Sequence, residues 1–138
     1  MRNGLTPSDL GDFLEQPVVA ILATHRADGT VLLSPVWHEW RDGGFSVATT
    51  SGDVKLRHLA RDPNASIVVA ESSLPYRGIE LCCTPSVFPD PEGELSLRLA
   101  VRYLGEERGR AYAATLGDDM VIRLEPGSLR VWDFADEL

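Results

Sequence analysis

Two tight-turn sequences constrain the fold of this chain more than any other feature. RADG at Arg26–Gly29 and RDGG at Arg41–Gly44 separate three segments rich in strand-forming residues, at 18–24, 30–40 and 45–50. Asp-Gly and Gly-Gly pairs between such segments are typical of β-hairpin turns, because glycine adopts the positive φ angles that these turns require. Two consecutive hairpins predict three antiparallel strands in a meander.

The hydrophobic period changes after the meander. A cap candidate (Ser51 or Asp53) and a later proline predict a helix over 51–63. The other expected elements are a short helix at 6–14, strands at 65–71 and 78–84, a loop at 87–94, one or two helices within 95–117, and a closing hairpin of strands at 119–126 and 128–134. Short antiparallel strands with turns about every 8–12 residues favour a small barrel over a βαβ sheet.

The chain length and the net charge limit the number of domains and the classes of function that the protein can have. The 138 residues suffice for one domain and leave no room for a second core. A formal net charge of −8 argues against a nucleic-acid binder, because phosphate neutralisation needs clustered basic residues. No apolar run reaches the roughly 18 residues of a membrane span, and the first ten residues carry no secretion pattern, which predicts a cytoplasmic protein.

The sequence offers no metal signature. Its two cysteines, Cys82 and Cys83, are neighbours in an expected strand, so they should point to opposite faces, one inside and one outside, and stay reduced. Three histidines without CxxC or HExxH spacing predict no zinc site. Since there is also no GxGxxG motif, any redox chemistry has to come from a bound cofactor.

The second strand of the meander carries the aromatic candidates. Pro35 cannot donate to a sheet ladder, so it marks an edge strand or a bulge. Trp37 and Trp40 lie three residues apart and should point to opposite faces, so one can enter the core while the other faces a partner or a flat ligand. The favoured interpretation is that both aromatic side chains simply cover the barrel. His38 points away from Trp37; a structural histidine is the favoured interpretation, and a proton donor is the alternative.

The junction between the third strand and the following helix is the strongest candidate binding site. Free backbone N–H groups and the hydroxyls of Thr49, Thr50 and Ser51 would attract an anion there. Lys55, the only lysine among thirteen basic residues, lies in the first helical turn, where the helix dipole disfavours a cation unless an anion binds. The alternative is a solvated basic helix face. His58 is expected to pack, with a contact to the anion as its alternative.

Several sequence blocks resemble a known family. They are ILATHRADGTVLLSPVWHEW, FSVATTSGDVKLRHLARDPNASIVV, PYRGIEL, RYLGEERGRAYA and IRLEPGSLRVWDF. On these blocks the chain resembles actinobacterial pyridoxamine-phosphate-oxidase-like proteins, in particular their branch of deazaflavin (coenzyme F-420)-dependent reductases. The resemblance covers 12–134 and implies one split-barrel domain over 1–138 with its core at about 12–134.

The resemblance implies a mainly β, antiparallel split barrel of six to seven strands with a few short helices. It also implies a homodimer with two cofactor sites between the subunits. An outward-facing Trp37 or Trp40 would place the meander and the following helix at the interface. The cofactor phosphate would lie at the start of the helix after the third strand. The residues matched to the phosphate are Thr49, Thr50, Ser51 and Lys55, those matched to the cofactor ring are Ser34, Pro35, Val36 and Trp37, and Arg77 matches a loop residue that faces the site.

The resemblance implies an oxidoreductase in which reduced F-420 delivers hydride to a small conjugated substrate. FMN held by the same residues is the alternative cofactor, and a non-catalytic protein that binds a flavin, a deazaflavin or a tetrapyrrole is the alternative function. The chain departs from the family pattern at Val54, where many members have arginine, and at His58, where many have asparagine. The loss of one phosphate-binding cation would weaken the anion site by ~1–3 kcal/mol.

Overall fold

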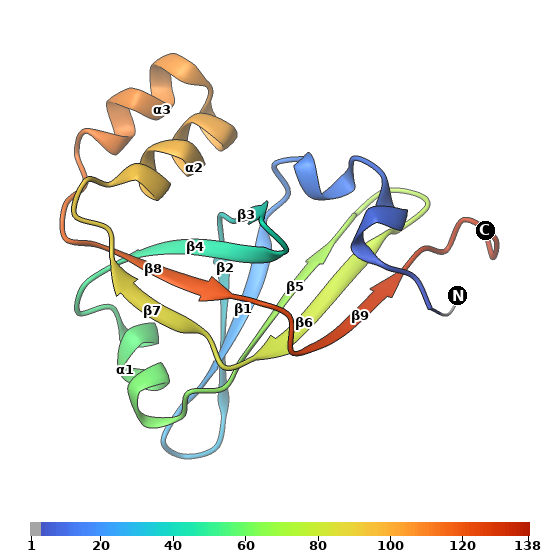
Figure 1. Ribbon diagram of the computed structural model, residues 1–138, viewed down its shortest axis with the longest axis horizontal. Helices are drawn as coiled ribbons and strands as arrows, with labels where there is room; N and C mark the ends of the chain where they lie inside the picture. The colour runs from blue at the N-terminus through green and yellow to red at the C-terminus, as the bar shows by residue number, and fades with distance from the viewer. Residues whose placement is uncertain (1–3) are drawn as a thin grey trace.

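The chain forms two antiparallel sheets that share one core (Figure 1). A computed structural model of the protein describes residues 4–138. The strands are β1 (Ala20–His25), β2 (Val31–Val36), β3 (Glu39–Arg41), β4 (Gly44–Thr50), β5 (Ala65–Ala70), β6 (Gly78–Cys83), β7 (Ser86–Pro89), β8 (Asp119–Leu124) and β9 (Ser128–Trp132). One sheet has the order β2-β1-β5-β6-β9 and the other β3-β4-β8-β7. The mainly β, antiparallel class predicted from the sequence is confirmed.

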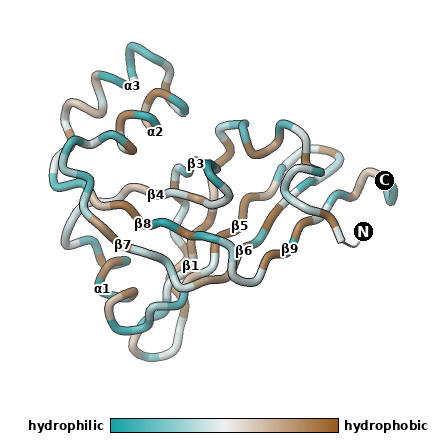
Figure 2. Tube along the Cα trace, in the orientation of Figure 1, coloured by the Kyte–Doolittle hydropathy of each residue, from teal (hydrophilic) through white to brown (hydrophobic). Residues whose placement is uncertain are grey.

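Helices fill the connections between the strands. They are the α-helices α1 (Val54–Arg61), α2 (Glu94–Leu104) and α3 (Glu106–Ala113) and the 3₁₀ helices η1 (Pro7–Leu10) and η2 (Phe13–Glu15). The mostly hydrophilic α3 lies outside the amphipathic α2 (Figure 2). The two helices approach closely at Gly109, where a Cβ atom would lie 2.6 Å from the Val101 backbone. Within residues 4–138, no helix has the length and apolar character needed to cross a membrane.

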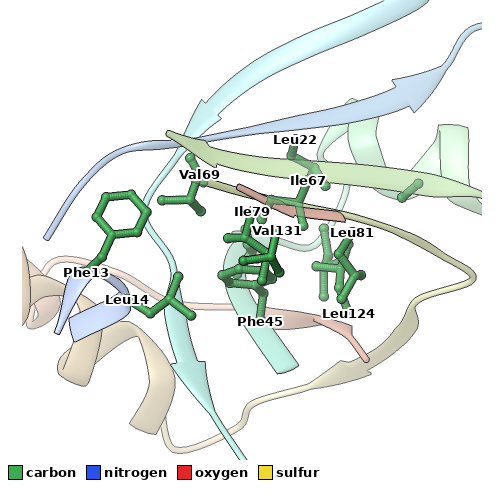
Figure 3. Close-up of a cluster of buried hydrophobic side chains, with 14 of the residues drawn as sticks. Phe13, Leu14, Leu22, Phe45, Ile67, Val69, Ile79, Leu81, Leu124 and Val131 are labelled. Atoms are coloured by element: carbon green, nitrogen blue, oxygen red, sulfur yellow. The ribbon is translucent and has the colours of Figure 1, made fainter. Parts of the chain in front are cut away.

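The core lies between the two sheets (Figure 3). Leu22, Ile67 and Ile79 enter it from the five-stranded sheet, and Phe45 and Leu124 from the four-stranded sheet; each is at most 1% exposed. Buried and half-buried residues alternate along β1, as expected for a strand with one face on the core. Burial of this apolar surface is the main free-energy term that holds the two sheets together.

The expected N-terminal helix is instead two short 3₁₀ turns. Gly11, with a φ of +63°, ends the first turn and prevents one continuous helix. Thr6 is the N-cap of the first turn. Leu10, Phe13 and Leu14 are all buried, so the two turns still place their apolar side chains in the core.

The segment at 30–40 does not form one strand. The hairpins β1–β2 and β3–β4 both form as predicted, but β2 and β3 belong to different sheets, so the single three-stranded meander is wrong. The chain leaves the first sheet at Trp37 and His38. There the His38 N–H donates to the Tyr103 hydroxyl (3.1 Å) instead of to a strand. Pro35 lies on the edge strand β2, as predicted.

Two further expectations near the C-terminal end are wrong. β8 and β9 do not form a closing hairpin, because β8 pairs with β4 and β7 while β9 pairs with β6. At the corner between them, a Cβ atom on Gly127 would lie 2.5 Å from the Cys82 carbonyl oxygen, so glycine lets the chain cross between the sheets. The expected loop at 87–94 begins with β7, an edge strand that tolerates Pro89. β3 and β7 account for strands beyond the expected six or seven.

Candidate functional site

A pocket of about 440 Å³ lies where β4 meets α1. Its walls come from the ends of β2 and β4, the start of α1, both α2 and α3, and the start of β8; most of these elements lie at the left of Figure 1. The volume is that of a small-molecule or cofactor site. The lining residues are Val19, Pro35, Val36, Trp37, Ala48, Thr49, Thr50, Asp53, Lys55, Ser96, Leu99, Tyr112, Leu116 and Asp119.

Aromatic contacts fix one wall of the pocket. The Trp37 indole stacks on the Tyr103 ring, with 4.9 Å between centroids and 6° between planes. Tyr112 meets Trp37 edge-on at 5.8 Å. The Tyr103 hydroxyl donates to the Val18 carbonyl oxygen (2.8 Å) and accepts from the His38 N–H (3.1 Å). Trp37 is therefore held in one orientation by Tyr103 of α2 and Tyr112 of α3.

The two tryptophans pack on different hydrophobic clusters, consistent with the opposite faces that their spacing predicted. Trp40 packs on the main core and meets Phe45 at 4.7 Å. Trp37 instead packs on the smaller cluster that contains Leu99 and Val121, beside the pocket. The structure therefore has the arrangement in which one tryptophan enters the core and the other does not, which was the alternative to the favoured interpretation.

The other end of the pocket is polar. Thr49 and Thr50 end β4, and the side chain of Lys55 reaches back to Asp53, the N-cap of α1. Lys55 Nζ lies 3.2 Å from Asp53 Oδ1 and 3.3 Å from Oδ2. Burial alone would raise the pKa of Asp53, but hydrogen bonds from the Lys55 N–H and ammonium and with Thr49 outweigh it and hold that pKa below its ordinary value.

The chain itself occupies most of the backbone N–H groups at this junction. Ser51 N–H donates to the Asp118 carbonyl oxygen (2.9 Å) and Asp53 N–H to that of Thr50 (3.1 Å). Lys55 N–H donates to Asp53 Oδ1 (2.8 Å). The expected set of free donors is therefore wrong for these groups, because backbone carbonyl oxygens occupy two of them and the N-cap carboxylate occupies the third.

The structure brings Pro35, Val36, Trp37, Thr49, Thr50 and Lys55 together around the pocket. Ser34 and Ser51 lie beside it and do not line it. Arg77 lies elsewhere in the subunit: its Nε donates to Glu71 (2.6 Å), its Nη1 donates to the Leu10 carbonyl oxygen (3.0 Å), and its guanidinium lies over Phe13. Within one chain, Arg77 ties the N-terminal turns to the β5–β6 loop.

The histidines have structural positions. His58 Nδ1 and Thr24 Oγ1 share a hydrogen bond of 2.9 Å that joins α1 to β1, so the expected packing role is confirmed. His38 is fully buried, and neither ring nitrogen has a hydrogen-bond partner among residues 4–138. Burial, with the nearby Arg102 charge as a second cause, lowers the pKa of His38 to about 4. His38 does not line the pocket, so its position favours the structural interpretation.

The cysteines are both free and half-buried. Cys83 packs against the main core, and Cys82 Sγ accepts a hydrogen bond from Ser66 Oγ (3.2 Å) on the neighbouring strand. Burial raises the pKa of the Cys83 thiol. In residues 4–138, no group of three or more His, Cys, Asp or Glu side chains is placed to hold a metal ion.

Sequence reasoning missed the contribution of the helices to the pocket. The sequence predicted one or two helices within 95–117 without assigning them to a site, yet Tyr103 and Tyr112 from these helices both contact Trp37. The signal was the spacing of Leu95, Leu99 and Tyr103, which lie four residues apart on one helix face. Asp119 was placed only in a strand; its pairing with Thr50 across β4 and β8 puts it in the pocket wall.

Comparison with known proteins identifies the family. The family model for pyridoxamine 5'-phosphate oxidase matches residues 7–133, which is nearly the whole chain. The chain belongs to the pyridoxamine 5'-phosphate oxidase-like family of split β-barrels. The predicted split barrel is thereby confirmed. No curated protein matches the chain significantly.

Solved structures with the same fold include three of interest. A conserved hypothetical protein, Rv2991 of Mycobacterium tuberculosis, has a TM-score of 0.80 and 22% identity, covering 100% of this chain and 92% of its own. An F420 reductase has a TM-score of 0.72 and 29% identity, covering 86% and 94%. HutZ, a heme storage protein of Vibrio cholerae, has a TM-score of 0.66 and 21% identity, covering 91% and 93%. The same fold therefore occurs in a protein described as an F420 reductase and in one described as a heme storage protein.

Proposed function

We propose that the pocket binds a flavin-type cofactor, reduced F-420 in the first place, and that the protein is an oxidoreductase acting on a small conjugated substrate. One observation carries the proposal: a single pocket joins an apolar wall to hydroxyl and ammonium donors. The apolar wall contains Pro35, Val36 and Trp37, and the donors come from Thr49, Thr50 and Lys55. The similarity to an F420 reductase over 86% of this chain supports the choice of deazaflavin.

The residues of the pocket suit the two parts of such a cofactor. Flat tricyclic rings bind apolar and aromatic surfaces, and the wall around Trp37 offers one that is held by Tyr103. Hydroxyl groups and an ammonium group are the donors that bind phosphate oxygens. When bound, the reduced deazaflavin supplies the hydride; the chain positions the ring, holds the phosphate and excludes water from the apolar wall.

The charges of the pocket favour F-420 over FMN at the phosphate. The phosphate of F-420 is a diester with one negative charge, whereas the monoester of FMN carries close to two near neutral pH. Among residues 4–138, Lys55 is the only basic side chain that lines the pocket. Because no arginine lines it, we propose that the acidic tail of F-420 extends from the pocket into solvent. FMN bound by the same residues remains the alternative.

We further propose that the protein is a homodimer with its cofactor sites at the interface. The edge strand β2 carries apolar side chains on its exposed side, with Leu33 63% exposed and Val31 41% exposed. Val19, a pocket residue, is 48% exposed. A second copy that covers this surface would also cover the pocket, because Pro35 and Val36 on the same strand line it.

Binding and turnover test the proposal separately. Purified protein is mixed with F-420 or FMN and passed through gel filtration, with visible absorption recorded across the protein peak. Co-elution of F-420 is expected, and re-oxidation of the reduced form by a panel of enones, quinones and bilins should follow. Binding without turnover would favour the non-catalytic binding protein. Elution of both cofactors apart from the protein would overturn the proposal.

A further inference from the structure

Asp53 places a negative charge at the position where a cofactor phosphate would bind. It is the N-cap of α1, and its Oδ1 accepts the Lys55 N–H at 2.8 Å, a donor that would otherwise point at a ligand. Its two carboxylate oxygens lie 3.2 and 3.3 Å from Lys55 Nζ. The carboxylate therefore takes both the backbone donor and the ammonium donor that the phosphate would use.

This pair changes the electrostatics of the whole pocket. The side chains of Lys55 and Asp53 are only 16% and 28% exposed, so solvent screens their charges less than those of a surface pair. Asp119 lines the same pocket. One ammonium and two carboxylates give the lining a formal net charge of 1 − 2 = −1. A ligand with one negative charge meets the local attraction of Lys55, whereas each further charge adds repulsion from the carboxylates.

We infer that Asp53 is a specificity-determining residue that makes the pocket select cofactors by the charge on their phosphate group. A singly charged phosphate diester binds better than a doubly charged monoester, because Asp53 already neutralises the cation that a dianion would need. The inference rests on the proposed cofactor site and deepens it. It assigns Asp53 a role beyond capping α1, which asparagine or serine would fill equally well.

Asp53→Asn separates the two roles of this side chain. Asparagine is as good an N-cap as aspartate but carries no charge. The probes are riboflavin, FMN and the monomethyl ester of FMN, which carry zero, about two and one negative charges on otherwise similar ligands. The three matching deazaflavins are run in parallel. Dissociation constants come from fluorescence titration, and Asp53→Ser, which also retains a capping oxygen, serves as a second variant.

We expect Asp53→Asn to bind FMN at least about tenfold more tightly than the wild type, with a smaller gain for the monomethyl ester and less than a twofold change for riboflavin. Asp42→Asn is the matched control. It removes the same formal charge in the β3–β4 turn, at the opposite end of β4 from Thr50, and should leave all three constants unchanged.

Three results would overturn the inference. An unchanged ratio of FMN to riboflavin affinity in Asp53→Asn would leave Asp53 as a helix cap only. Weaker FMN binding in both variants would show that Asp53 positions Lys55 for the phosphate instead of competing with it. If none of the six ligands binds to wild type or variants, the proposed cofactor site fails, and the inference fails with it; the riboflavin measurements distinguish this case from the first two.

Discussion

Trp37 and Tyr103 stack almost parallel, with 6° between their ring planes, although 65 residues separate Tyr103 from the His38 that follows Trp37. The stack joins the end of β2 to α2 and makes the helical hairpin part of the pocket. The Tyr103 hydroxyl also donates to the Val18 carbonyl oxygen and accepts from the His38 N–H. The shape of the apolar wall therefore depends on a residue outside the strands.

Tyr103→Phe should separate the stack from its hydrogen bonds. The substitution keeps the ring but leaves the Val18 carbonyl oxygen and the His38 N–H without their partner, which should lower the free energy of unfolding by about 1–3 kcal/mol. Urea denaturation measures this loss. Tyr112→Phe, which keeps the other ring beside Trp37, is the control and should change stability by less than about 0.5 kcal/mol. Equal losses in the two variants would contradict the role of the Tyr103 hydroxyl.

Lys55→Ala should weaken the binding of phosphorylated cofactors by ~1–3 kcal/mol, or about tenfold to a hundredfold in dissociation constant. Riboflavin, which has no phosphate, should lose much less. Asp53 keeps its hydrogen bonds with the Lys55 N–H and with Thr49 when the ammonium is removed, so the free energy of unfolding should change by less than about 1 kcal/mol. Titrations and thermal melts measure both effects.

Arg57→Ala is the control for this variant, since Arg57 is exposed on the same helix and does not line the pocket. It should leave both ligand affinities unchanged. An equal loss for FMN and riboflavin in Lys55→Ala would show that Lys55 does not hold the phosphate. A large loss of stability in the ligand-free protein would make Lys55 a structural residue.

His38 should make the protein less stable in weak acid. Its folded pKa of about 4 lies below the ordinary histidine value of 6.5, so the unfolded chain takes up the proton first as the pH falls. The free energy of unfolding should therefore decrease between about pH 6.5 and pH 4, by up to about 3 kcal/mol. Stability recovers as the pH rises through this window, because the buried ring is neutral in the folded state.

His38→Leu tests this origin of the pH dependence. The ring nitrogens of His38 have no hydrogen-bond partner among residues 4–138. An apolar side chain of similar volume should therefore preserve or raise the free energy of unfolding at pH 7 and make it depend less on pH below pH 6.5. Chemical denaturation at half-unit pH intervals measures it. His25→Gln, a change at the end of β1, should retain the slope of the wild type. An unchanged slope in His38→Leu would assign the acid sensitivity to other groups.

Arg77→Ala should lower the free energy of unfolding of the ligand-free protein, whether or not it also affects ligand binding. The Glu71 side chain is only 8% exposed, and removal of Arg77 would leave its charge nearly buried and unpaired, at a cost of about 2–4 kcal/mol in unfolding free energy. The double variant with Glu71→Ala should recover part of the loss. If a partner subunit also brings Arg77 to the cofactor, the double variant will still bind cofactor more weakly. Wild-type affinity in the double variant would confine Arg77 to its structural contacts.

Leu33→Asp should convert the proposed dimer into a monomer. Leu33 is 63% exposed on β2, so a charge there costs little in an isolated subunit and much at a buried apolar interface. Light scattering at micromolar concentration should give twice the mass of the chain for the wild type and the single mass for the variant. Leu138→Asp, at a side chain that is 67% exposed, should remain dimeric. A monomeric wild type would contradict the dimer and the shared site.

The sequence predicts local structure well where one residue type determines it. Asp53 was one of two cap candidates because its side-chain oxygen can accept a helical N–H, and Pro35 indicated an edge strand because it cannot donate. The pairing of strands was harder, because β8 and β9 have the pattern of a hairpin whether they pair with each other or with distant strands.

In the candidate site, too, the chemistry of single residues was predictable and the contacts between distant elements were not. Trp37, Thr49, Thr50 and Lys55 were proposed from their chemistry and do line one pocket. The neutralisation of Lys55 by Asp53 was missed, since the two residues were considered separately, as a cation and as a possible cap. The helical wall of the pocket depends on how α2 packs on β4 and α3 packs on α2, which no local pattern specifies.

The path of the backbone between the sheets has a consequence for how the protein acquires its structure. The chain changes sheets from β2 to β3, from β4 to β5, from β6 to β7 and from β8 to β9. Neither sheet can therefore form from one continuous segment of the chain. The pairing of β4 with β8, which places Thr50 opposite Asp119, joins segments that are far apart in the sequence. Such long loop closures carry an entropy cost that is recovered only when both sheets form. Folding should be slow and cooperative, and fragments cut in the β5–β6 loop should gain structure only when mixed.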